Sequence, residues 1–366
     1  MSEDARHLWL GLSMASRIGP RRLKQLLPAF GDDARALWHA SASDLEAAGL
    51  ERRAASEFVS FRGKVNLDEH WRKISAAGIR VLFWPDEDYP PQLAQISDPP
   101  IALYVRGSLT QEDRLALAIV GARKASAYGR EVAQHFARKL AERGVTIVSG
   151  LAHGVDAAAH RGALEANGRT LAVLGSGIDV IYPYDHRALA DEIAAQGAII
   201  SEFPLGTKPD RFNFPRRNRL ISGLSLGVLV AEASDKSGAL ITAALAAEQG
   251  KDVFAVPGSI FSDASSGVNQ LIQDGAKPVM KIEDILEELN ITAQAMETRQ
   301  TAERIAPADP VEAQVLAAIG ADGAHVDALA RSTGLPIQAL LSTLMLMELK
   351  GLVAQSAPMH YTRVRG

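Results

Sequence analysis

The chain has 366 residues, of which 47% are hydrophobic, and it contains no cysteine. Two or three domains are expected from that length, and the lack of cysteine excludes disulfides and thiolate metal sites. The formal net charge of −4 at pH 7 argues against a protein that binds nucleic acid through overall basicity, so any such partner would need a local basic patch.

The first apolar stretch, HLWLGL, follows acidic residues and lacks a basic leader. It is too short for the core of a signal peptide, and no segment approaches the roughly 18 apolar residues that a membrane span requires. The sequence therefore predicts a cytoplasmic protein with no membrane partner.

Residues 1–65 have the pattern of a small helical domain. Pro20 stands where a first helical turn tolerates proline, and leucines follow it at helical spacing. The segment SRIGPRRLKQLL is similar to a helix-hairpin-helix that could receive a DNA phosphate, and a packed turn without ligand is the alternative. Residues 66–100 are a predicted connector, and its proline-rich part, from WPDEDYPPQL to ISDPP, is expected to be extended rather than helical.

Residues 101–289 alternate apolar, strand-like runs with amphipathic helices. The runs are LALAIV, VTIVS, TLAVLG, AIISEF, GVLVAE and DVFAVP. Between the first two, Val132, Phe136 and Leu140 repeat at helical spacing, and Gly144 ends the predicted helix. Continuous apolar strands of this kind are typical of a parallel sheet covered on both faces, so an α/β domain is predicted.

Residues 290–310 lack an apolar period and are a predicted linker. Residues 311–366 contain three predicted helices and a short YTRV strand, an order that resembles a winged helix. This region contains four basic and four acidic residues, and Lys350 is the one basic residue of the predicted recognition helix. Reading of duplex DNA in the major groove normally needs more basic and amide side chains, so a protein-contact or dimer-supporting role is expected instead.

Glycines follow several of the predicted strands in the α/β domain. Gly121, Gly150 and Gly175 each come directly after an apolar run, where helix N-termini present unpaired amides. Without a β-carbon a phosphate can approach the backbone closely, so an anionic ligand is predicted, and simple tight turns are the alternative. The nucleotide fingerprints GxGxxG and GxxxxGK[ST] are absent, and Arg123 and Lys124 in the first loop favour phosphate over ribose, so no cofactor is predicted.

The segment FNFPRRNRLISGLS combines three arginines with an amide and two aromatic rings. Aromatic faces stack exposed bases irrespective of sequence, while basic groups follow the phosphate backbone. Both features together fit an unpaired strand. The alternative is a solvated charged loop whose phenylalanines lie in the core.

Taken in order, VGARKASAYG, VSGLAHGVDAAAH, AVLGSGIDVIYP, SEFPLG, FPRRNRLISGLS, SGALITA, FAVPG and GVNQLIQDGA resemble the motif series of the DprA/Smf DNA-processing family over residues 115–277. The N-terminal helices and the C-terminal winged helix resemble the family's accessory domains, with less specific motifs. The resemblance implies an extended Rossmann-like domain that binds single-stranded DNA and forms a homodimer. It also implies loading of the RecA recombinase in natural transformation and DNA recombination, without catalysis.

By motif position, the resemblance implies that Phe214 contacts a base. The expected phosphate-binding residues belong to the glycine loops and the basic segment, namely Gly121, Arg123, Lys124, Gly150, Gly154, Gly175, Lys208, Arg211, Arg216, Arg217, Asn218, Arg219, Ser237 and Gly238. The sequence departs from the family's usual residues in three places. They are Ala122 in place of serine, Ser126 with Ala127 in place of threonine and proline, and His153 in place of arginine.

Two rival interpretations concern other chemistry. His153, Asp156 and His160 would share one helix face and could hold a metal. An acid in the first helical turn and ordinary packing of the histidines explain them better, so no metal is predicted. A phosphoribohydrolase-like enzyme on a related Rossmann-like fold would need a PGGxGTxxE loop. In the comparable SGALITAALAAE, Leu245 stands where the acid is expected and Glu248 comes too late, so a binding protein is predicted rather than an enzyme.

Overall fold

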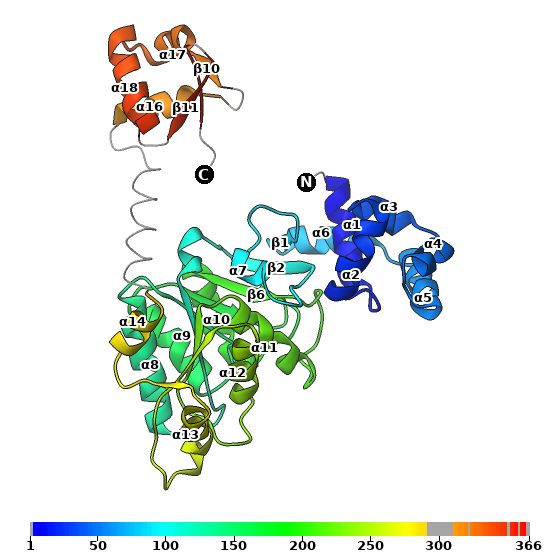
Figure 1. The fold of residues 1–366 in the computed structure, drawn as a ribbon, viewed down its shortest axis with the longest axis vertical. Coiled ribbons are helices and arrows are strands. Elements are labelled where there is room, and N and C mark those ends of the chain that lie inside the picture. Colours follow the sequence, from blue (N-terminus) through cyan, green and yellow to red (C-terminus); the bar gives the residue numbers. More distant parts are fainter. Residues whose placement is uncertain (1–2, 291–309, 321–322, 350–351, 358, 364–366) are drawn as a thin grey trace. The chain divides into compact units, whose positions relative to one another are not determined.

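The computed structural model describes residues 3–290, 310–320, 323–349, 352–357 and 359–363. They belong to two compact units, Met1–Leu289 and Asn290–Gly366 (Figure 1). The predicted linker over residues 290–310 lies outside the described residues except at its two ends. Among the described residues no helix combines the length and apolarity that crossing a membrane would demand.

The first unit begins with a run of short helices, as predicted. They are α1 (Glu3–Met14), α2 (Pro20–Leu26), the 3₁₀ helix η1 (Leu27–Phe30), α3 (Ala34–His39), α4 (Ala42–Ala47), α5 (Arg52–Arg62) and α6 (Leu67–Ala76). Side chains define several starts, because Asp33, Ser41 and Asn66 each accept a hydrogen bond from an amide in the first turn that follows.

The predicted connector is more structured than expected. Residues 66–100 contain α6, the strand β1 (Arg80–Phe83) and a short helix α7 (Pro91–Ala94). The prediction that its proline-rich part is extended was therefore wrong. Pro91 occupies the first position of α7, where its missing amide proton costs nothing and its fixed φ favours the helix.

A nine-stranded sheet forms the centre of the first unit. Its strands are β1, β2 (Ala102–Gly107), β3 (Ala116–Val120), β4 (Thr146–Ser149), β5 (Thr170–Val173), β6 (Ala198–Ser201), β7 (Gly227–Val230), β8 (Asp252–Ala255) and β9 (Lys277–Pro278). Their order is β1-β2-β6-β5-β4-β3-β7-β8-β9, parallel from β6 to β9 and antiparallel at β1 and β2. All six predicted strands are present, so the predicted parallel core is confirmed.

Helices cover both faces of this sheet (Figure 1). They are α8 (Ala127–Ala141), α9 (Val155–Glu165), the 3₁₀ helix η3 (Tyr184–His186), α10 (Arg187–Gln196), α11 (Asn213–Gly223), α12 (Ala239–Glu248), α13 (Ser266–Gln273) and α14 (Glu283–Glu288). The packing places α9 and α10 on one face and α11, α12 and α13 on the other. Successive strand residues point to opposite faces, so β1 contributes Val81 and Phe83 to the core shared with the N-terminal helices and Leu82 to the opposite core.

The second unit has its own apolar core. Its helices α16 (Pro310–Ala318), α17 (Val326–Thr333) and α18 (Ile337–Leu349) accompany a sheet of β10 (Ala324–His325), β11 (Val353–Ala357) and β12 (His360–Arg363), ordered β10-β12-β11. Val315, Leu329 and Leu344 are fully buried there. The three helices and the predicted YTRV strand are present, and β10 and β11 complete the wing, so the predicted winged helix is confirmed.

Candidate nucleic-acid interface

A cleft opens where the strand order of the sheet reverses. β3 pairs with β4 on one side and β7 on the other, so the loops that follow these strands diverge, and ligands of open parallel sheets bind at such a point. The cleft encloses about 790 Å³, within the size range of ligand sites. It is lined by these residues of the predicted set: Gly121, Arg123, Lys124, Arg211, Phe214, Arg217, Asn218, Ser237 and Gly238.

The predicted basic segment is helical rather than a loop. α11 starts at Asn213, so Pro215 falls in the first turn, where no intrahelical partner is needed for the missing amide proton. The amide of Phe212 donates to Oδ1 of Asp210 at 2.8 Å just before the helix. The helix therefore presents Arg217 on a different side from Arg216 and Arg219, and the three arginines do not act as one cluster.

One wall of the cleft is aromatic with a cation above it. The guanidinium of Arg123 lies 4.9 Å from the ring centroid of Phe214. On the same side of the cleft the Tyr182 ring lies 5.8 Å from the Phe214 ring, tilted by 37°. Tyr182 was not in the predicted set. Its one signal in the sequence is an aromatic residue in the loop after a glycine-rich strand end, next to a proline.

The glycines of the loops prove to be required by packing. A β-carbon at Gly150 would stand 2.6 Å from the Arg217 guanidinium, and one at Gly175 would stand 2.6 Å from the Phe214 ring. At Gly154, with φ of 77°, a β-carbon would lie 2.2 Å from the carbonyl oxygen of Ala122. Protein atoms thus occupy the space beside these three glycines, where a phosphate was predicted to approach the backbone. Open space remains at Gly238, directly before α12.

Arg217 lines the cleft but is already engaged. Its side chain is buried and donates to the carbonyl of Gly150 at 2.8 Å and, over a shorter distance, to that of Val173. Burial lowers the pKa of Arg217 to about 10, and the nearby charge of Asp156 opposes that change. The arginine stays cationic at neutral pH and holds the ends of β4 and β5 together.

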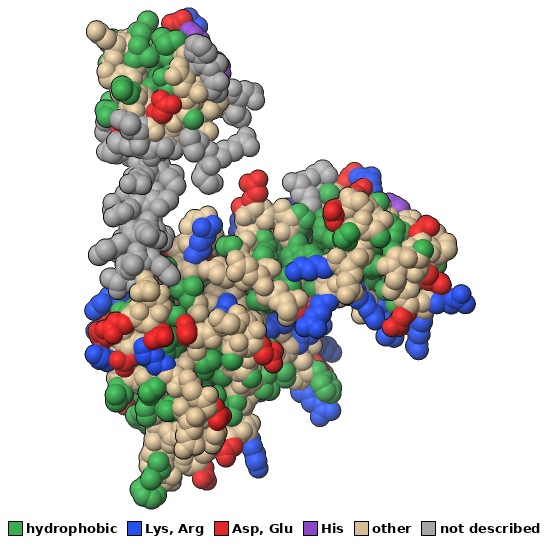
Figure 2. Space-filling model, in the orientation of Figure 1, with side chains coloured by type: hydrophobic (Ala, Val, Ile, Leu, Met, Phe, Trp, Pro, Cys, Tyr) green, Lys and Arg blue, Asp and Glu red, His purple; other side chains and the backbone are tan. Residues whose placement is uncertain are grey.

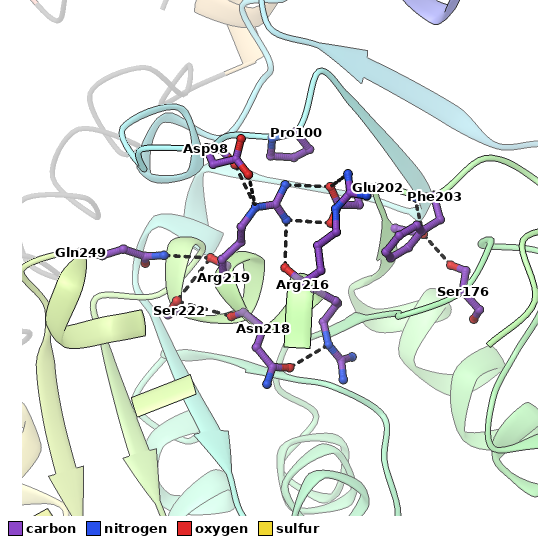
Figure 3. A network of polar contacts seen from close by, with 12 residues as sticks. Asp98, Pro100, Ser176, Glu202, Phe203, Arg216, Asn218, Arg219, Ser222 and Gln249 are labelled. Atoms are coloured by element: carbon purple, nitrogen blue, oxygen red, sulfur yellow. Dashed lines mark hydrogen bonds and ion pairs between the residues drawn. The ribbon is translucent and has the colours of Figure 1, made fainter. Parts of the chain in front are cut away.

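Arg219 points away from the cleft, which departs from its expected role. Figure 3 shows Arg216 and Arg219 converging on Glu202, the residue that follows β6. Both terminal nitrogens of Arg219 donate to the Glu202 carboxylate at 2.7 Å, and Nε donates to the carbonyl of Asp98 at 2.9 Å. Burial by itself would lower the pKa of Arg219, but the charge and hydrogen bonds of Glu202, together with the charge of Asp98, outweigh burial and raise that pKa. Glu202 was not predicted as the partner of Arg219.

The structure does not bring the remaining predicted residues into the cleft lining. Lys208 is exposed in the segment between β6 and α11, and Arg216 keeps 57% of its side chain exposed beside Glu202. Gly150, Gly154 and Gly175 lie beneath cleft residues. The cleft therefore holds three exposed cations, Arg123, Lys124 and Arg211.

On the face shown in Figure 2, basic side chains are interspersed with acidic ones and do not form one continuous basic surface. This distribution agrees with the net charge of −4. Within the cleft the balance is different, because the cations face a single lining acid, Asp156. That carboxylate accepts the amides of Gly150 and Ala152, and its burial raises the pKa of Asp156.

The rival metal trio is not assembled. Asp156 lies in the first turn of α9, as its capping interpretation predicted, and His153 precedes that helix. His160 is buried, with Nδ1 2.7 Å from Oγ1 of Thr170. The Thr170 hydroxyl donates to the carbonyl of Ile147 at 2.8 Å, so its oxygen accepts the proton of His160 Nδ1. His160 Nε2 is buried without a hydrogen-bond partner among the described residues.

His160 should make the first unit sensitive to acid. Burial lowers the pKa of His160 to about 3 from 6.5. Below pH 6.5 the imidazole is protonated in the unfolded chain but stays neutral in the folded chain. The free energy of unfolding therefore decreases as the pH is lowered from 6.5 to about 3. One such group changes stability by about 1.4 kcal/mol per pH unit. Urea unfolding at several pH values in this window should show a shallower decline for His160→Gln.

The matched control for this measurement is His135→Gln, since His135 is exposed on α8. It should keep the pH dependence of the wild type. Equal slopes for the wild type and His160→Gln would contradict the assignment of the effect to His160.

Comparison with known proteins gives matches along most of the chain. The family described as DNA recombination-mediator protein A matches residues 80–290, and the DprA winged helix domain matches residues 299–357. The chain is 40% identical over 356 residues to Protein Smf of Escherichia coli (strain K12), with 94% of this chain and 95% of that protein aligned.

Two solved structures are also similar. DNA processing protein A (DprA) from Streptococcus pneumoniae has a TM-score of 0.69 and 36% identity, covering 77% of this chain and 97% of its own. DNA processing protein A from Helicobacter pylori, whose structure is described for its unique single-stranded DNA binding mode, has a TM-score of 0.53 and 33% identity. That match covers 58% of this chain and 96% of the other.

Proposed function

This chain belongs to the DprA/Smf family of DNA recombination-mediator proteins, and from that premise we propose that its cleft binds single-stranded DNA. The observation that carries the proposal is the wall formed by Arg123, Phe214 and Tyr182. Unpaired bases can stack on such rings, while a guanidinium above the ring meets the phosphate or the base face. A paired duplex keeps its bases stacked inside and cannot use the same wall.

The cations of the cleft supply the electrostatic part of the proposed binding. Arg123, Lys124 and Arg211 are exposed at its rim, and the N-terminus of α12 adds the positive end of a helix dipole beside Gly238. Arg217 and Asn218 line the same space. Arg219 is left out of the proposed phosphate contacts, because Glu202 and Asp98 occupy its donors.

We infer that the site binds DNA without turning it over. The rival phosphoribohydrolase needs an acid three residues after Thr242, and α12 carries Leu245 there. Glu248 lies at the last position of α12 and lines a different hollow from Thr242. A nucleotide-turnover assay should therefore give no rate above background, and a rate abolished by Glu248→Gln would favour the enzyme instead.

Membership of the family also supports the finer part of the proposal. We propose that the chain forms a homodimer and transfers its bound strand to the RecA recombinase during natural transformation and DNA recombination. Light scattering of the purified full chain tests the dimer. RecA filament formation on single strands coated with a single-strand binding protein tests the transfer, which should be faster with this chain present.

The salt dependence of binding tests the central proposal. Each phosphate contact on a single strand contributes a slope of about 0.7 in log affinity against log salt, so three cations predict roughly twentyfold weaker binding from about 50 to 200 mM salt. Arg211→Ala should bind more weakly and lose roughly sevenfold over the same range. Labelled single-stranded and duplex oligonucleotides of matched length would be compared by fluorescence anisotropy.

Arg143→Ala is the matched control for charge. Arg143 is exposed beyond the end of α8, a helix of 15 residues that begins three residues after the cleft residue Lys124. The helix is about 22 Å long. This variant should keep the affinity and slope of the wild type. Duplex preference, or a slope lowered equally by both variants, would move the binding site away from the cleft.

A further inference from the structure

Beside α9 the fold gathers three side chains with metal-binding atoms that lie far apart in the sequence. His153 precedes α9, and Asp185 and His186 belong to η3. One ligand atom from each lies within 4.8 Å of the other two. Nε2 of His153 is 3.7 Å from Oδ1 of Asp185, and the rings of His153 and His186 are 4.6 Å apart at 72°.

The buried member of this trio has the tautomer that a metal ligand needs. His186 is only 5% exposed, and its Nδ1 lies 2.9 Å from the carbonyl oxygen of Leu151. A carbonyl can only accept, so Nδ1 carries the proton and Nε2 keeps its lone pair. A backbone carbonyl holding one imidazole nitrogen while the other binds the ion is the usual support of a metal-bound histidine.

The other two members are free to complete the geometry. The side chains of His153 and Asp185 are 53% and 68% exposed, so both can rotate without disturbing the core. Zinc ligands at about 2.0 to 2.2 Å in a tetrahedron lie roughly 3.4 Å from one another. The separations, at most 4.8 Å, therefore need to shrink by up to about 1.4 Å, through exposed side chains alone.

We propose that His153, Asp185 and His186 form a three-ligand site for Zn²⁺ or a similar divalent transition metal. Two imidazoles and one carboxylate are a ligand set that zinc accepts, with water in the fourth position. Mg²⁺ and Ca²⁺ prefer oxygen ligands and are not expected. The ion would join the loop before α9 to η3. This goes beyond the proposed function, since it requires no DNA.

The site escapes sequence analysis because its two histidines are not at ligand spacing on one element. The trio that the sequence suggested, His153, Asp156 and His160, loses two members to other partners. In the fold, Asp185 and His186 lie beside His153 instead, although α9 and β5 separate them from it in the sequence.

The test uses the full chain, stripped of metal by a chelator and free of nucleic acid. Zn²⁺ is titrated in competition with a chromophoric chelator, and Co²⁺ is added separately to record its visible absorption. The wild type should bind one Zn²⁺ per chain and give the absorption of four-coordinate Co²⁺. His153→Gln and Asp185→Asn should each weaken Zn²⁺ binding at least about tenfold, whereas Mg²⁺ should not compete.

His135→Gln, which removes an exposed histidine from α8, is the matched control and should bind Zn²⁺ like the wild type. The two test variants change exposed side chains, and thermal unfolding without metal will show that they fold. Zn²⁺ should raise the unfolding temperature of the wild type and His135→Gln but not of His153→Gln. Equal Zn²⁺ affinity in all four proteins, or octahedral Co²⁺, would overturn the proposal. Neither outcome would affect single-strand binding by the cleft.

Discussion

Replacing Arg219 with methionine is expected to lower the free energy of unfolding by about 3 to 5 kcal/mol. The Arg219 and Glu202 side chains are 9% and 3% exposed and share two hydrogen bonds of 2.7 Å. Methionine fills much of the same volume but leaves the Glu202 carboxylate buried and short of its main partner. Urea unfolding of the first unit would measure the loss.

The matched control is a variant of Arg216, the second arginine beside Glu202. Arg216 also approaches Glu202, at 3.4 Å, but its side chain is 57% exposed. Arg216→Met should therefore cost less than about 1 kcal/mol, as exposed ion pairs do. Adding Glu202→Gln to Arg219→Met should recover part of the loss, because it removes the unpaired charge.

DNA binding separates this structural role from the role expected from sequence. Below its unfolding temperature, Arg219→Met should bind single-stranded oligonucleotides with nearly the affinity and the salt slope of the wild type. A stable variant with a flatter salt slope would return Arg219 to the phosphate contacts and contradict the assignment to Glu202.

Phe214→Ala is expected to weaken single-strand binding by about 1 to 3 kcal/mol, the range for removing one base-stacking ring. The ring lies beneath the Arg123 guanidinium and beside Tyr182. Because no charge is lost, the salt slope should stay that of the wild type. This separates Phe214→Ala from Arg211→Ala, which should flatten the slope. Anisotropy titrations at several salt concentrations measure both quantities.

Phe214→Tyr preserves the ring face and is the matched control for stacking. It should bind within a small factor of the wild type. Thermal unfolding of both variants would check folding, since Phe214 also contacts Gly175. A lower salt slope for Phe214→Ala would mean that the ring acts by positioning Arg123. Unchanged affinity would mean that the ring does not take part in binding.

The sequence by itself determined the layered architecture and the general position of the site. Six apolar runs predicted the central strands, because residues buried on both faces of a parallel sheet must be continuously apolar. The glycines after those runs marked the edge where the cleft opens, and motif order identified the family. Arg123, Lys124, Arg211 and Phe214 were all predicted and all line the cleft.

The tertiary structure alone decided which partner each polar residue has. Arg217 and Arg219 have the same local sequence pattern in PRRNR. Arg217 nevertheless holds two strand ends together, whereas Arg219 pairs with Glu202. Gly150 and Gly175 were predicted to bind phosphate, but they leave space for the side chains of Arg217 and Phe214. The physical reason is that the partner of a buried charge, and the atoms that pack against a glycine, come from segments distant in the sequence. Local patterns record which residues are buried or basic, and only the packed chain assigns their partners.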